Sequence, residues 1–246
     1  MGLPEIVSRD EWLVARKALL AKEKEMTRQR DRLSADRRRL PMVKIDKDYV
    51  FDGPDGSRSL LDLFDGHRQL IVQHFMWLWD EDTGCPSCTA GSDEISDGLI
   101  AHLHARDTNL VVISRGPIDS IERYKATRGW TFPFFSSYGS DFNYDFNVTI
   151  DASVKPVLWN FRTIDELEQH GMGWLGEGSW EQPGYSVFLR DGEAVFHTYS
   201  TYARGCEQLG GSYYFLDTTA LGRQEDWEEP KGRATSGRGA VPDFSS

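Results

Sequence analysis

The Cys-Pro-Ser-Cys motif at residues 85–88 contains the side chains whose type and spacing most clearly predict chemistry. The apolar segment 68–78 precedes it and segment 90–104 has a helical pattern, so we expect Cys85 directly after a buried strand and at a helix N-terminus. Free amides and the helix dipole stabilise a thiolate at that position. A spacing of three brings Cys88 onto the same side of the helix. We therefore expect Cys85 to attack a disulfide or oxidised substrate and Cys88 to resolve the mixed disulfide.

Residues next to the motif are expected to contact the substrate or to tune the thiol. Pro86 suits the first helical turn, where its missing N–H costs nothing, and we expect Pro86 and Trp79 to contact substrate. Three acidic residues, 80–82, lie between Trp79 and the motif. Carboxylates that face Cys85 would raise the pKa of its thiol, and the sequence leaves their direction open.

Alternating strands and helices are expected to position this motif. The expected strands cover residues 47–51, 68–78, 110–114, 185–189 and 194–199, the last two forming a hairpin around an Asp-Gly turn. The expected helical segments cover residues 60–64, 90–104, 118–127 and 201–216. This order predicts an α/β protein with a thioredoxin-like three-layer sandwich.

The first 40 residues differ from the rest in charge and pattern. They contain 11 of the 28 Lys and Arg and 7 of the 39 Asp and Glu, a net charge of +4, so the remaining 17 basic and 32 acidic residues give −15. Ser8 and Glu11 have capping-box spacing, and Pro41 is expected to end the helix. We expect an N-terminal helical extension over 1–40, a thioredoxin-like domain over 41–222 and a flexible, charged C-terminal tail over 223–246.

Composition limits the partners of the chain. The net charge of −11 argues against a general nucleic-acid binder. The sequence has no apolar stretch that could span a membrane and no secretory signal pattern, so we expect a cytoplasmic location without membrane contact. An apolar stripe recurs every seven residues along the first helix, and we expect it to pack on its own domain, with a homodimer as the alternative. The stripe consists of Trp12, Leu19, Met26 and Leu33.

Several strings resemble a thioredoxin-like bacterial family catalogued as domain of unknown function 899, over residues 4–223. They are RRRLPMVKIDKDYVFDGPDG, HLHARD, GWTFPFFSSYGSDFNYDF, SVFLRDG and HTYSTYARG. The resemblance implies a thioredoxin-like fold, and the GWTFPFFSS segment is similar to one in peroxiredoxins, which implies the peroxiredoxin-like variant. Thioredoxin-like proteins carry a cis-proline before the hairpin, and the segment EQPGYSVFL implies that Pro183 is this proline and contacts substrate.

The favoured function is a thiol-disulfide oxidoreductase with an unidentified oxidised substrate, an unidentified cellular thiol reductant and no cofactor. One alternative is a thiol peroxidase, in which Cys85 would form a sulfenic acid. Another is copper or zinc delivery by the Cys pair and His197, which we expect to point outward from the hairpin. The chain lacks a second Cys-x-x-Cys, so no metal site is assigned. Cys206 is expected to be a small buried hydrophobe and His74 a core residue.

Overall fold

The computed structural model describes residues 4–209, 211–221, 223, 227–229 and 231. The chain forms two compact units. Among the described residues, the helical unit contains residues 4–41 and those from 213 onward, and the sheet unit contains those between 42 and 212. Most of the expected tail, residues 223–246, lies outside the described residues. Within the described residues, no helix combines the length and apolar character needed to cross a bilayer.

The helical unit is built on α1 (Arg9–Arg37), which begins where the sequence predicts. The Ser8 side chain accepts from the Glu11 N–H and the Glu11 carboxylate accepts from the Ser8 N–H, so the predicted capping box is confirmed. No residue of α1 is buried. The expected helix over 201–216 is instead a 3₁₀ segment, η4 (Ala203–Leu209), followed by α7 (Ser212–Leu216).

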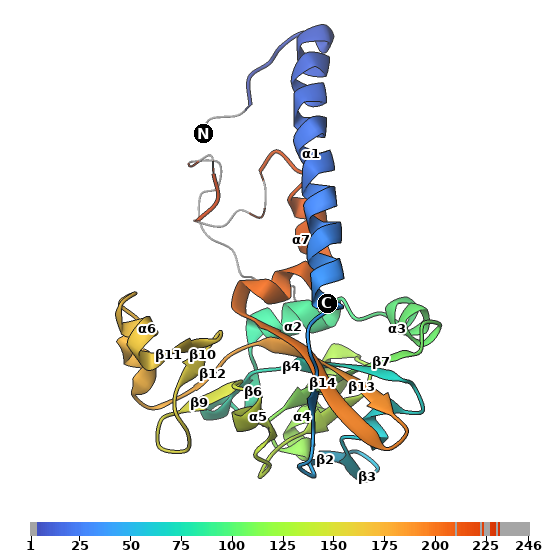
Figure 1. The fold of residues 1–246 in the computed structure, drawn as a ribbon, viewed down its shortest axis with the longest axis vertical. Helices are drawn as coiled ribbons and strands as arrows, with labels where there is room; N and C mark the ends of the chain where they lie inside the picture. Colours follow the sequence, from blue (N-terminus) through green and yellow to red (C-terminus); the bar gives the residue numbers. More distant parts are fainter. Residues whose placement is uncertain (1–3, 210, 222, 224–226, 230, 232–246) are drawn as a thin grey trace. The chain divides into compact units, whose positions relative to one another are not determined.

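The sheet unit contains an eight-stranded mixed sheet (Figure 1). In spatial order its strands are β1 (Val43–Lys44), β14 (Ala194–Tyr202), β13 (Gly184–Asp191), β4 (Gln69–His74), β7 (Thr108–Ser114), β8 (Phe134–Ser136), β2 (Val50–Gly53) and β3 (Gly56–Ser59). The three central strands β4, β7 and β8 are parallel, and the outer strands pair antiparallel. The carboxyl ends of the parallel strands therefore meet at one edge, where ligand sites form in open α/β sheets.

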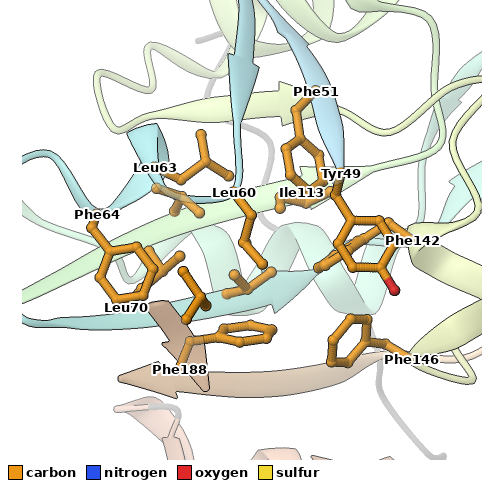
Figure 2. Close-up of a cluster of buried hydrophobic side chains, with 13 residues drawn as sticks. Tyr49, Phe51, Leu60, Leu63, Phe64, Leu70, Ile113, Phe142, Phe146 and Phe188 are labelled. Atoms are coloured by element: carbon orange, nitrogen blue, oxygen red, sulfur yellow. The ribbon is translucent and has the colours of Figure 1, made fainter. Parts of the chain in front are cut away.

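Alternating side chains of the central strands build a separate core on each face of this sheet. On β7, Val111 and Ile113 enter a core covered by η1 (Asp62–Phe64) and α5 (Phe142–Asp145), which we call the aromatic face. Figure 2 shows Phe142 and Phe146 next to Phe188 of β13 in this core.

Val112 of β7 enters a second core on the opposite face. This core includes residues of α2 (Pro86–Asp93) and α4 (Ile118–Arg128), and we call it the helix face. One sheet between two covering layers is the thioredoxin-like sandwich, so the predicted fold class is confirmed.

Residues between β8 and β13 form a smaller cluster within the sheet unit. Its elements are β9 (Thr149–Asp151), β10 (Leu158–Trp159), β11 (Arg162–Thr163), α6 (Ile164–Glu168), η3 (Gly173–Gly176) and β12 (Ser179–Glu181). They enclose a separate small core of Ile150, Val157, Leu167 and Leu175. This cluster leads directly into Pro183 and β13.

Two predicted elements next to the cysteines are wrong in their extent. The expected strand over 68–78 ends at His74, and a short hairpin follows it: β5 (Trp77–Leu78), η2 (Trp79–Glu81) and β6 (Thr83–Gly84). Cys85 therefore follows this hairpin and not the buried strand. The expected helix over 90–104 is α2 and a separate α3 (Asp97–His104), because the Ser96 side chain caps a new helix.

Candidate thiol redox site

The hairpin β5–β6 returns the chain to the end of β4 and thereby fixes Cys85. The Cys85 N–H donates to the Met76 carbonyl over 3.1 Å. Gly84, the preceding residue, lies so close to aromatic rings that a Cβ there would be 2.7 Å from Phe75 Cζ and 2.7 Å from Tyr124 Cε1. The position requires a glycine, because a side chain would push Cys85 away from the sheet.

Cys85 is the N-cap residue of α2, as the sequence predicts, with extended backbone (φ −60°, ψ 130°) and Pro86 in the first turn. The Thr89 N–H and hydroxyl both donate to the Cys85 carbonyl at 2.9 Å. The Thr89 hydroxyl also lies 2.7 Å from the Tyr124 hydroxyl. The start of α2 is thus tied to α4 through Thr89.

The two thiols have opposite pKa shifts. The Cys88 thiol donates to the Cys85 sulfur and, together with the N–H groups of Cys88 and Ser87, lowers the pKa of Cys85 to about 6 against the opposing effect of burial. The pKa of Cys88 is raised well above its usual value, first by the interaction with Cys85 and then by burial. All three cysteines carry free thiols. Near neutral pH the arrangement therefore presents a Cys85 thiolate beside a Cys88 thiol.

The acidic residues of the β5–β6 hairpin, residues 80–82, are not among the groups that shift the pKa of Cys85. The Asp82 carboxylate accepts from Trp77 Nε1 (3.2 Å) and the Ser120 hydroxyl (2.9 Å), and it forms an ion pair with Arg123 (3.2 Å). The groups that shift the pKa of Cys85 are Cys88, neighbouring amides and burial, and no carboxylate is among them. Asp82 thus anchors the hairpin to α4.

The expected substrate contacts surround the motif. Pro86 and Ser87 are exposed, whereas Cys85 and Cys88 are buried in the helix-face core. Trp79 is 43% exposed on η2 of the hairpin. Pro183 is half-buried and immediately precedes β13, whose register pairs Gly184 with His74. Continuing that register by one residue places Pro183 beside Phe75, at the carboxyl end of β4. Contact with substrate stays a prediction for all three residues.

His197 lies on the other side of the sheet from the cysteines, so its predicted outward direction is wrong. Its ring packs on Phe146 (5.2 Å between centroids) and Phe188 (5.6 Å) in the aromatic face, and its Nε2 lies 2.7 Å from the Ser200 hydroxyl. Along β14, His197 lies on the same side as the buried Val195 and pairs with Phe188, both in the aromatic core, so Phe196 is the residue that points to the opposite face. A metal site of Cys85, Cys88 and His197 is incompatible with this geometry. Among the described residues, no three His, Cys, Asp or Glu side chains are arranged to hold a metal ion.

His74 and Cys206 have roles close to those expected. His74 is buried in the aromatic face, where its Nε2 lies 2.8 Å from the Ser186 hydroxyl, and burial lowers its pKa to about 3. Cys206 is half-buried on η4 with its sulfur 3.8 Å from the Thr201 carbonyl, and burial raises its pKa to about 12. At neutral pH Cys206 is therefore a protonated thiol.

A family model described as "Bacterial protein of unknown function (DUF899)" matches residues 1–238. The chain belongs to this family. The expected membership is thereby confirmed, and the DUF899 description names no substrate. Comparison with curated proteins gives no match.

Solved structures similar to this DUF899 protein include three bacterial peroxiredoxins. A PrxQ mutant from Xylella fastidiosa is 10% identical, with a TM-score of 0.44, over 69% of this chain and 91% of that one. Peroxidoxin BcpB from Mycobacterium tuberculosis is 16% identical, with a TM-score of 0.43, over 69% and 93%. Peroxiredoxin Q from Xanthomonas campestris, as a mutant, is 14% identical, with a TM-score of 0.43, over 62% and 79%.

The DUF899 site also contains a half-buried ion pair that the sequence does not reveal. Glu181 of β12 lies 3.7 Å from the Arg115 guanidinium and accepts from the Thr149 hydroxyl at 2.9 Å. Burial raises the pKa of Glu181 to about 7, although Thr149, Arg115 and the Trp77 backbone oppose the shift. Arg115 directly follows β7, and its guanidinium lies 5.8 Å from the Trp79 ring centroid. The partners are separated by 66 residues, so only the fold brings them together.

Proposed function

We propose that this protein is a thiol-disulfide oxidoreductase in which Cys85 is the attacking thiolate and Cys88 the resolving thiol. One observation carries the proposal: Cys85, at the N-terminus of α2, has its pKa lowered to about 6 by the Cys88 thiol and two backbone amides. A thiolate and not a thiol is the nucleophile in disulfide exchange, so this shift makes Cys85 reactive at neutral pH.

The first step is attack by the Cys85 thiolate on one sulfur of a substrate disulfide. A new bond joins Cys85 to that sulfur, the substrate S–S bond breaks, and the second substrate sulfur leaves as a thiolate. Cys88 then loses its proton to solvent and attacks the Cys85 sulfur, which releases the first substrate sulfur as a thiolate. The substrate gains two electrons, the Cys85–Cys88 pair becomes a disulfide, and an external dithiol reductant restores it.

The groups that shift the pKa of Cys88 support this order of events. While Cys85 is a thiolate, interaction with it is the largest cause that keeps Cys88 protonated. In the mixed disulfide the charge on Cys85 is gone, so that cause disappears and the Met76 backbone contact, which lowers the pKa of Cys88, remains. Cys88 thus becomes a better nucleophile after substrate has bonded to Cys85.

Reaction with the chromogenic disulfide DTNB tests the assignment, in chains that all carry Cys206→Ser. With both active-site cysteines present, two equivalents of thionitrobenzoate should be released, because Cys88 displaces the second one. Cys88→Ser should release one equivalent and retain a mixed disulfide on Cys85, seen by intact-mass spectrometry. Cys85→Ser should react at least tenfold more slowly at pH 7, because the remaining thiol is buried. Equal rates for Cys85→Ser and the parent chain would reject the proposal.

A further inference from the structure

Two exposed aromatic side chains lie at the sheet edge that carries the cysteines. Trp79 is 43% exposed on the hairpin before Cys85, and Tyr138 is 59% exposed two residues after β8 ends. Their ring centroids are 6.0 Å apart. Large aromatic groups left exposed side by side on a soluble protein usually mark a contact surface.

Hydrogen bonds that involve buried residues hold both segments in place. The Trp79 hairpin is fixed through Asp82, whose contacts to Trp77 and α4 are described above. The Tyr138 N–H donates to the Ser136 hydroxyl at 3.1 Å, and that hydroxyl donates to the Gly116 carbonyl at 2.6 Å. Because the segments are held before any partner arrives, little conformational entropy is lost on contact.

The hairpin also carries unbalanced negative charge. Of the four carboxylates around it, Asp82 pairs with Arg123 and Glu181 with Arg115. Asp80 and Glu81 are exposed and have no ion pair within the described part of the chain. A partner that contacts Trp79 would therefore meet two uncompensated carboxylates, which favours basic groups.

The distance from Cys85 limits the substrates that can use this surface. Cys85 pairs with Met76, and Trp79 lies three residues further along the hairpin, about 10 Å at the rise of an extended strand. A small disulfide held at Cys85 does not reach that far. A polypeptide whose cysteine is held at Cys85 reaches Trp79 with a residue about three positions from that cysteine.

We propose that Trp79, Tyr138, Asp80 and Glu81 form a docking surface for a polypeptide disulfide that carries apolar and basic residues about three positions from its reactive cysteine. The proposal rests on the oxidoreductase function above and assigns its substrate class.

Steady-state reduction of matched substrates by the full-length protein, recycled by dithiothreitol, tests this surface. Two synthetic peptide disulfides differ only three residues from the cysteine, one carrying Leu-Lys and the other Ser-Glu, and hydroxyethyl disulfide serves as the small substrate. We expect roughly tenfold higher kcat/KM for the Leu-Lys peptide. Trp79→Ala and Tyr138→Ala should each lower the ratio of kcat/KM for that peptide to kcat/KM for hydroxyethyl disulfide by roughly fivefold or more.

Reversing the charge of the two exposed carboxylates tests the predicted preference for basic residues more directly. The double variant Asp80→Lys/Glu81→Lys should prefer acidic over basic residues when Leu-Lys and Leu-Glu peptides are compared. Trp174→Ala, which removes a tryptophan of similar exposure on η3, should leave unchanged the ratio of kcat/KM for the Leu-Lys peptide to kcat/KM for hydroxyethyl disulfide. Turnover of hydroxyethyl disulfide without any difference between peptides or variants would overturn the docking surface alone. Absence of turnover with hydroxyethyl disulfide and with every peptide would overturn the oxidoreductase function on which it rests.

Discussion

At the scale of single residues, the molecule distinguishes two cysteines that look equivalent in the sequence. Both are buried on the helix face, yet the pKa of one is lowered and that of the other raised. Pro86 and the spacing of the motif made the helix start at Cys85 predictable, and Cys85 as the attacking thiolate stays a prediction. The sequence could not show that Asp82 is bound to Ser120 and Arg123, because these partners are 38 and 41 residues away.

The reactivity of Cys85 should depend on the Cys88 thiol. In the wild type, the alkylation rate of Cys85 by iodoacetamide should reach half its maximum near pH 6. Cys88→Ala removes the largest cause of the low pKa, so the midpoint should move upward by about one pH unit or more. Peptide mass spectrometry separates Cys85 from Cys206, which should stay unmodified below pH 9 because its pKa is raised to about 12. An unchanged midpoint would show that Cys88 does not stabilise the thiolate.

At the scale of elements, the hairpin between β4 and α2 could not be predicted from the sequence. Segment 68–78 is interrupted by Gln73 and His74 but is apolar again from Phe75 to Leu78, so a single strand fits its pattern as well as a strand that ends at His74. Likewise the break between α2 and α3 depends on one side-chain cap, Ser96, within a pattern that remains helical on both sides. The order of the elements along the chain was predictable because β4, β7 and the final hairpin are long and strongly patterned.

Two glycines on either side of the motif should respond oppositely to the same substitution. Gly84→Ala places a Cβ against Phe75 and Tyr124 and should cost about 1–3 kcal/mol of unfolding free energy. Gly91→Ala, inside α2, meets only Gln73 Nε2 at 3.9 Å and should stabilise the protein by about 0.5–1 kcal/mol. Urea unfolding of the reduced proteins measures both. Equal effects of the two variants would contradict the close packing of Gly84 beneath Cys85.

At the scale of the whole molecule, the central sheet separates the core that contains the two motif cysteines from the aromatic core. His74 and His197 lie among aromatic rings on one side, and the cysteines lie beneath α2 on the other. The predicted side of His197 is wrong because it takes Phe196 as the residue that faces the core, whereas Val195 and His197 face the aromatic core and Phe196 points away from it. The Arg115–Glu181 pair is likewise a product of the complete fold.

Glu181 should make global stability depend on pH. Its folded pKa is raised from 4.5 to about 7, so between these values the folded state binds more protons than the unfolded state, and stability falls as pH rises. Relative to Glu181→Gln, the wild type should lose up to about 3 kcal/mol of unfolding free energy between pH 4.5 and pH 8. Urea unfolding of both proteins at several pH values gives this difference. A difference that is constant, or that grows with pH, would contradict the raised pKa.

The central claim, a reversible Cys85–Cys88 redox pair, is tested most directly by differential alkylation and mass spectrometry after equilibration in graded thiol redox buffers. We predict a single Cys85–Cys88 disulfide that forms and disappears with a two-electron slope, about 30 mV per tenfold change in the ratio of oxidised to reduced protein, while Cys206 stays a free thiol. A Cys85–Cys88 pair that remains reduced in every buffer, or a disulfide that requires Cys206, would contradict the account.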